Sequence, residues 1–106
     1  MLLSNAFSLQ MLDLSKPGSF TVKQLTVEKA IEIFRKEGLE SSVGHAEAAE
    51  RLSAILGMKV EMNRKSTLLT SGQSIIVAQV TGGRLQEGAV TVPPEYAIKF
   101  MLVTVD

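Results

Sequence analysis

His45 is the one histidine of the chain, and it follows Gly44 at the start of a predicted helix. Histidine is the side chain that most readily exchanges a proton near neutral pH. The N-terminus of a helix carries unpaired N–H groups and the positive end of the helix dipole, so it attracts anions. This combination indicates acid–base chemistry on an anion such as a phosphate ester. The alternative is a surface histidine without a role.

A glycine-rich loop, Thr81–Gly88, follows a strongly apolar segment and offers a second set of candidate groups. Gly82 and Gly83 let backbone N–H groups approach a ligand closely, and Arg84 offers a planar pair of donors to phosphate oxygens. Ligands of α/β sheets bind beyond the ends of strands, which is where this loop is expected. The alternative is an exposed turn in which Arg84 and Glu87 only pair with each other.

Small polar side chains gather near the N-terminus, and two basic residues lie further along the chain. Such groups at the end of a strand suit the edges of a ribose or a base, but they also serve as ordinary caps and turn residues. On residue types alone, the sequence does not separate an enzyme from a small binding module. The residues concerned are Ser4, Asn5, Ser8 and Gln10, with Arg64 and Lys65.

Composition excludes several kinds of chemistry. The chain has 106 residues, no cysteine, one histidine, and aspartate only at positions 13 and 106. Thiolate chemistry is therefore absent and metal ligands are scarce, so we expect no metal. The phosphate-binding and nucleophile-elbow motifs are also missing, and we expect no cofactor.

Charge argues against two classes of partner. Eleven basic side chains balance eleven acidic ones, and no basic stripe is visible. Affinity for duplex DNA needs far more local positive charge, so a DNA-binding protein ranks last among the functions considered. The opening residues show neither a basic leader nor a long apolar run. We therefore expect no membrane partner and a cytoplasmic location.

The elements that must position these groups follow from hydrophobic periodicity. Two helices are predicted: Val27–Glu37, capped by Thr26 and closed by Gly38, and a second one capped by Ser41 or Ser42 that ends at Gly57. The pattern indicates one α/β domain over residues 1–106, with a mixed five-stranded sheet and the helices on one face. The predicted strands are Leu2–Ala6, Ser19–Leu25, Met58–Met62, Ser74–Val80 (central, covered on both faces) and Tyr96–Val105.

Three separated stretches of the sequence resemble the viral anti-CRISPR ring nucleases. The stretches occur in the family's order, and the resemblance spans nearly the whole chain. One departure is clear: the family often carries Ser-Thr where this chain has Glu47 and Ala48. The matching stretches are Ser4–Ser8 with Met11-Leu12, then Gly44-His45, then Ala78-Gln79 with Arg84–Gly88.

The resemblance implies a metal-independent homodimer that cleaves cyclic tetra-adenylate, the second messenger of type III CRISPR defence. It implies that His45 is the general acid, that Glu87 assists catalysis and that Arg84 stabilises the phosphate. The products would be linear fragments ending in 2′,3′-cyclic phosphate, formed in the cytoplasm of the host cell if the gene is viral. The alternative is a protein that sequesters a cyclic nucleotide without cutting it. The implied ligand contacts are Asn5, Ser8, Gln79 and Arg64, and Gly83 is a further candidate contact because the glycine-rich loop lets its backbone approach a ligand.

Overall fold

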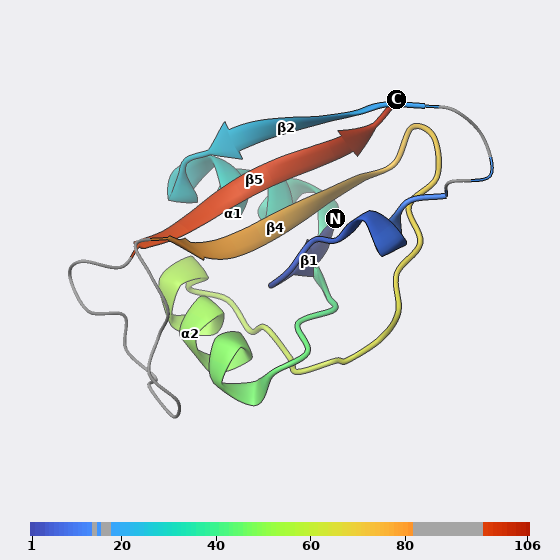
Figure 1. Ribbon diagram of the computed structural model, residues 1–106. Helices are drawn as coiled ribbons and strands as arrows, with labels where there is room; N and C mark the ends of the chain where they lie inside the picture. The colour runs from blue at the N-terminus through green and yellow to red at the C-terminus, as the bar shows by residue number, and fades with distance from the viewer. Residues whose placement is uncertain (14, 16–17, 82–96) are drawn as a thin grey trace.

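A mixed sheet forms the centre of the molecule (Figure 1). The computed structural model describes residues 1–13, 15, 18–81 and 97–106, and within them five strands run in the order β2-β5-β4-β1-β3. β1 pairs in parallel with both β3 and β4, whereas β5 pairs antiparallel with β4 and β2. The predicted α/β class is confirmed. The strands are β1 (Leu2–Ser4), β2 (Phe20–Leu25), β3 (Glu40–Ser41), β4 (Ser74–Thr81) and β5 (Ala97–Val105).

Two helices, α1 (Val27–Glu37) and α2 (Ala46–Leu56), cover one face of the sheet (Figure 1). Phe34 of α1 and Leu52 of α2 pack in one buried cluster with Ile76 of β4 and Phe100 of β5. The predicted grouping of the helices on one face is therefore confirmed. Burial of these apolar side chains is the main force that holds the helices on the sheet.

The first helix begins and ends where the sequence predicts. Thr26 is its N-cap, with the side-chain oxygen accepting the N–H of Lys29 at 3.1 Å. Gly38 ends it in a backbone conformation with φ of 83°, which a residue without a side chain adopts most easily.

The central strand β4 is buried on both faces, as its apolar run predicts. Ile76 and Ala78 pack toward the helices. Ile75 and Val77 belong to a second cluster on the opposite face, with Leu69. The short 3₁₀ helix η1 (Leu9–Met11) adds Met11 to that second cluster, so the segment after β1 lies against the helix-free face.

The second helix does not begin near Ser41 or Ser42. It begins at Ala46, and His45 is its N-cap. Ser41 is part of β3, and the N–H of Ser42 bonds to the carbonyl of Leu3 at 2.9 Å. Both serines therefore pair with β1 and do not cap the helix. The predicted end at Gly57 is confirmed.

Met58–Met62 is not a strand of the sheet, and the fifth strand is β3 instead. The N–H of Val60 bonds to the side-chain oxygen of Ser53 at 2.8 Å, so the segment is tied to α2. Only Met62 makes a bridge, to Val43. Val60 is buried, but Met62 is 55% exposed, so the inward alternation stops before Met62.

Candidate functional site

A polar pocket of about 330 Å³ lies at the carboxyl ends of the parallel strands β1 and β3. Open α/β sheets bind ligands beyond the carboxyl ends of their strands, so this is a favourable position. Three segments distant in sequence meet here. The polar pocket is lined by Ser4, Asn5, Ala6, Ser8, Gln10, Met11, Ser42, Gly44, Arg64, Lys65, Ser66 and Thr67.

β1 ends at Ser4, two residues before the predicted end at Ala6, so Asn5 lies just beyond the strand and lines this pocket. The Ser4 hydroxyl donates to the carbonyl of Ala6 at 2.8 Å and accepts the N–H of Ala6 at 3.3 Å, which turns the chain after Ser4. The side-chain oxygen of Asn5 then accepts the N–H of Gly44 at 3.2 Å. This bond joins the end of β1 to the start of α2.

Three of the predicted ligand contacts, Asn5, Ser8 and Arg64, line the same pocket. Arg64 donates to the carbonyl oxygen of Gly44 from Nε at 3.2 Å and from Nη2 at 3.1 Å. Asn5 and Arg64 are 59 positions apart in the sequence. The structure brings them to the same pocket.

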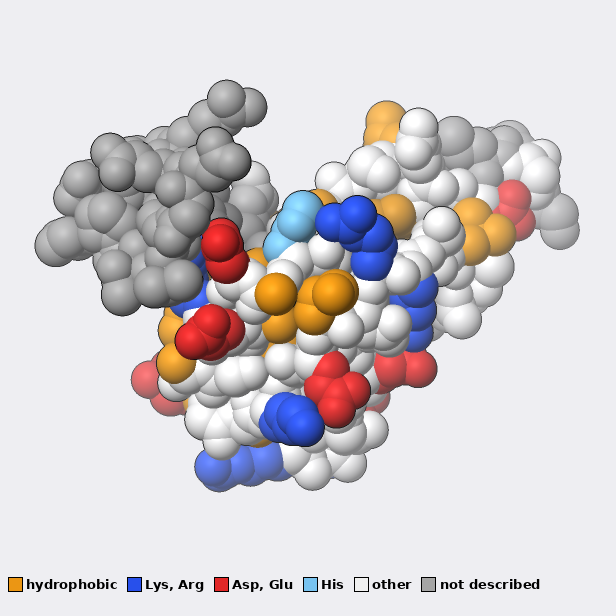
Figure 2. All heavy atoms as spheres, turned by 90° about the horizontal axis from the view of Figure 1, so that it is seen from below, with side chains coloured by type: hydrophobic (Ala, Val, Ile, Leu, Met, Phe, Trp, Pro, Cys, Tyr) orange, Lys and Arg blue, Asp and Glu red, His pale blue; other side chains and the backbone are white. Residues whose placement is uncertain are grey.

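His45 stands at the edge of the polar pocket, directly after the lining residue Gly44. It is the N-cap of α2, and its side chain makes no capping hydrogen bond. Figure 2 shows the histidine at the molecular surface, beside a basic side chain. The imidazole is therefore accessible to a ligand at the N-terminus of the helix, where an anion is favoured.

Gln79 lines a second depression, an apolar groove of about 440 Å³ on the helix-free face. The groove adjoins the polar pocket, because Asn5 and Ala6 line both. Gln79 lies on β4 two residues beyond Val77, which pairs with Ser4 of β1. The apolar groove is lined by Asn5, Ala6, Phe7, Val22, Val77, Gln79, Met101 and Val103.

Gly83, Arg84 and Glu87 lie outside the residues that the structure describes. The last described residue before them is Thr81, at the end of β4.

Charge in the polar pocket is positive. Arg64 and Lys65 are its ionisable lining residues, and Lys65 also contacts Glu40 at 3.6 Å. Serine and threonine hydroxyls supply further hydrogen-bond donors. Asp13, whose pKa the side chain and backbone N–H of Ser15 hold below its usual range, does not line the pocket. Two neighbouring cations and several hydroxyls suit a phosphate group.

Sequence reasoning missed Ser42, Ser66 and Thr67 as members of this site. The sequence predicts Ser42 as one of two alternative helix caps, the other being Ser41. Ser66 and Thr67 follow two basic residues directly, so the run Arg64-Lys65-Ser66-Thr67 combines cations with hydroxyls. That combination is a signal for anion binding, but in a loop it is difficult to distinguish from ordinary surface polarity.

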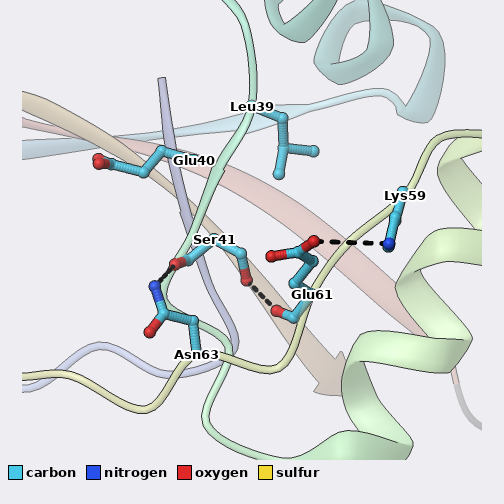
Figure 3. Close-up of a pocket in the computed structure, with 6 residues that line it drawn as sticks. All are labelled: Leu39, Glu40, Ser41, Lys59, Glu61 and Asn63. Carbon is cyan, nitrogen blue, oxygen red and sulfur yellow. Dashed lines mark hydrogen bonds and ion pairs between the residues drawn. The ribbon is translucent and has the colours of Figure 1, made fainter.

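A further pocket, shown in Figure 3, is lined in part by β3 and differs chemically from the polar pocket. The Ser41 hydroxyl donates to the carbonyl of Glu61 at 2.5 Å, and the side-chain N–H of Asn63 donates to the carbonyl of Ser41 at 2.9 Å. Lys59 pairs with Glu61 at 3.5 Å. These polar groups satisfy one another, and the two carboxylates, Glu40 and Glu61, disfavour an anion.

The described residues contain neither a metal-binding cluster nor a membrane-spanning helix. No three His, Asp or Glu side chains cluster there as ligands for a metal ion. Within the same residues, neither helix has the length and apolar character that crossing a membrane requires.

Comparison with known proteins identifies relatives from viruses. A family model described as STIV B116-like matches residues 1–99. An uncharacterized protein of Sulfolobus islandicus filamentous virus is 36% identical over 78 residues, which cover 71% of this chain and 65% of that protein. The chain thus spans less than two thirds of that relative's length.

A solved structure shares the fold. B116 of Sulfolobus turreted icosahedral virus superposes with a TM-score of 0.76 at 25% sequence identity, and the match covers 97% of each chain. The similarity therefore extends over nearly the whole chain.

Proposed function

The chain belongs to the STIV B116-like family, and on that premise we propose that it is a ring nuclease that cleaves cyclic tetra-adenylate without a metal ion. Its relatives are viral proteins. Destruction of this messenger in the host cytoplasm would switch off type III CRISPR defence.

One observation carries the proposal. Asn5, Ser8 and Arg64, three positions at which the ring-nuclease resemblance implies ligand contacts, line one pocket, and Gly44 beside them leads directly into His45. An arbitrary set of polar residues from separate stretches of the chain would not be expected to converge in this way. The positive charge of the pocket suits the phosphates of such a ligand.

The proposed reaction uses a nucleophile that the ligand itself carries. The ribose 2′-oxygen attacks the neighbouring phosphorus, the bond from phosphorus to the 5′-oxygen breaks, and the imidazolium of His45 gives its proton to that leaving oxygen. The 2′-hydroxyl proton passes to solvent or to Glu87. Arg84 stabilises the negative charge that develops on the phosphate. Positioning and general acid catalysis are the main contributions, and the latter typically gives about 10²–10⁴-fold.

The ligand would extend beyond the polar pocket. A ring of four nucleotides is larger than about 330 Å³ can hold. The neighbouring apolar groove, with Gln79 at its wall, offers a surface on which an adenine could lie. Two copies related by a twofold axis would match the symmetry of the ring and supply two copies of His45.

A second candidate function is sequestration of the cyclic nucleotide without cleavage. The position of His45 favours it in one respect, because His45 is beside the lining of the polar pocket and not part of it. Incubation of the purified protein with cyclic tetra-adenylate in EDTA, followed by chromatography, distinguishes the two. We expect linear fragments. Intact ligand after prolonged incubation, with tight binding, would replace the nuclease proposal by sequestration.

A further inference from the structure

The peptide that leads into His45 is held by a side chain from a distant segment. The carbonyl of Gly44 belongs to the peptide bond between Gly44 and His45, and it accepts both Nε and Nη2 of Arg64. The preceding peptide is held by a second residue, through the bond from the Gly44 N–H to Asn5. Two residues from distant segments, Asn5 and Arg64, therefore hold the backbone just before His45.

Arg64 is itself held in register with this backbone. The N–H of Asn63 bonds to the carbonyl of Val43 at 2.8 Å, and the Asn63 side chain bonds to the carbonyl of Ser41. Figure 3 shows this bond together with the one from Ser41 to Glu61. Because residues 61–63 run beside residues 41–43, Arg64 arrives next to Gly44.

His45 depends on this support more than an ordinary N-cap residue does. Its side chain makes no hydrogen bond to the helix that it caps, and its backbone is extended, with φ of −133° and ψ of 133°. The direction of the imidazole is therefore set through the backbone, at the peptide that Arg64 holds.

We propose that Arg64 is a positioning residue that couples an anion in the polar pocket to the orientation of His45. This rests on the proposed function, in which His45 is the general acid. A guanidinium has five N–H donors, so two bonds to Gly44 leave three for a phosphate oxygen in the pocket that Arg64 lines. A bound phosphate and the Gly44 carbonyl would thus both accept hydrogen bonds from the same rigid, planar guanidinium.

Lysine cannot replace arginine in this role. Its ammonium keeps the positive charge but is a compact group that lacks the planar fork. Arg64→Lys therefore separates the charge of Arg64 from its bridging geometry. Lys65→Ala is the matched comparison, because Lys65 is a neighbouring cation of the same pocket that forms an ion pair with Glu40.

The first arm of the test needs no cleavage. In NMR spectra of the ligand-free protein, Arg64→Lys and Arg64→Ala should shift the backbone amide resonances of His45 and Ala46. Lys65→Ala should leave these resonances unchanged. Addition of inorganic phosphate should move the His45 amide in the wild type but not in Arg64→Ala. Unmoved resonances in both Arg64 variants, or the same phosphate response in all variants, would overturn the coupling even if the protein is not a nuclease.

The second arm uses cyclic tetra-adenylate under single-turnover conditions. Arg64→Lys should bind with nearly wild-type affinity but cleave about ten- to a hundredfold more slowly, since small misplacement of a catalytic group has effects of this size. Lys65→Ala should mainly weaken binding of the ligand and leave the cleavage rate at saturation nearly unchanged. Full restoration of the cleavage rate by lysine would show that Arg64 contributes charge alone, which overturns the proposal and leaves the proposed function intact.

Discussion

The side-chain oxygen of Asn5 accepts a hydrogen bond from the N–H of Gly44 at 3.2 Å, although the two residues are 39 positions apart. The bond connects the carboxyl end of β1 with the residue before the N-cap of α2. It links the first stretch of the ring-nuclease resemblance to the second.

Asn5→Ala should remove this connection. We expect a loss of about 0.5–1.5 kcal/mol in the free energy of unfolding, the usual net value of one hydrogen bond, together with slower cleavage. Asn5→Asp is the control, because a carboxylate keeps the acceptor but repels a phosphate. Urea denaturation should therefore show near wild-type stability for Asn5→Asp, and calorimetry should show weaker ligand binding. Wild-type affinity in Asn5→Asp would remove Asn5 from the ligand site.

His45→Ala should abolish most cleavage while the protein stays folded. General acid catalysis is typically worth about 10²–10⁴-fold, so the single-turnover rate should fall at least about a hundredfold. Stability should change little, because the His45 side chain makes no capping hydrogen bond. Equilibrium binding of cyclic tetra-adenylate by His45→Ala should remain close to that of the wild type. A variant that cuts at nearly the wild-type rate would exclude His45 from the mechanism.

Glu47→Gln should have opposite effects on binding and on stability. Glu47 lies in the first turn of α2, where a negative charge stabilises the helix by about 0.3–1 kcal/mol. The same charge repels a phosphate bound near His45. Exposed charge interactions of about 0.2–1 kcal/mol correspond to affinity gains of up to about fivefold. Titration calorimetry and thermal unfolding measure the two effects; weaker binding by Glu47→Gln would mean that no phosphate lies near this turn.

Thr26→Ala tests the fold away from the site. Its hydroxyl caps α1 through the N–H of Lys29, and loss of such a cap costs about 1 kcal/mol. The Tm should fall by roughly 4–8 °C for a domain of this size. Cleavage measured well below the Tm should be unaffected, because Thr26 does not line the polar pocket. A large loss of activity would show that stability alone governs the activity of these variants.

The parts of the fold that local sequence specifies could be predicted. The helix from Val27 to Glu37 has a clear apolar stripe, an N-cap threonine and a closing glycine, so its ends follow from nearby residues. The apolar run of β4 likewise predicts a strand covered on both faces.

The parts of the fold that depend on contacts between residues far apart in the sequence could not be predicted. Ser41 and Ser42 look like helix caps locally, but pairing with β1 gives their backbone groups other partners. Met58–Met62 alternates like a strand, yet Ser53 binds both the N–H and the carbonyl of Val60.

The same distinction holds for the candidate site: the residue types could be predicted, and their arrangement in space could not. The types of residue at Asn5, His45 and Arg64 indicate phosphate chemistry, and the resemblance gives them roles. That Arg64 reaches the Gly44 carbonyl depends on the register between residues 41–43 and 61–63, which no local pattern encodes. Ser66 and Thr67 follow Arg64 in the chain and line the same pocket.

The origin of the oxygen atoms in the first product tests the nuclease proposal most directly. Purified protein would be incubated with cyclic tetra-adenylate and EDTA in water enriched in the heavy oxygen isotope. The mass of the earliest linear product would then be measured by mass spectrometry. Attack by the ligand's own 2′-oxygen predicts a 2′,3′-cyclic phosphate end that contains no oxygen from the solvent. Heavy oxygen on the phosphate of the earliest product, or a ligand that stays intact in EDTA, would contradict the proposal.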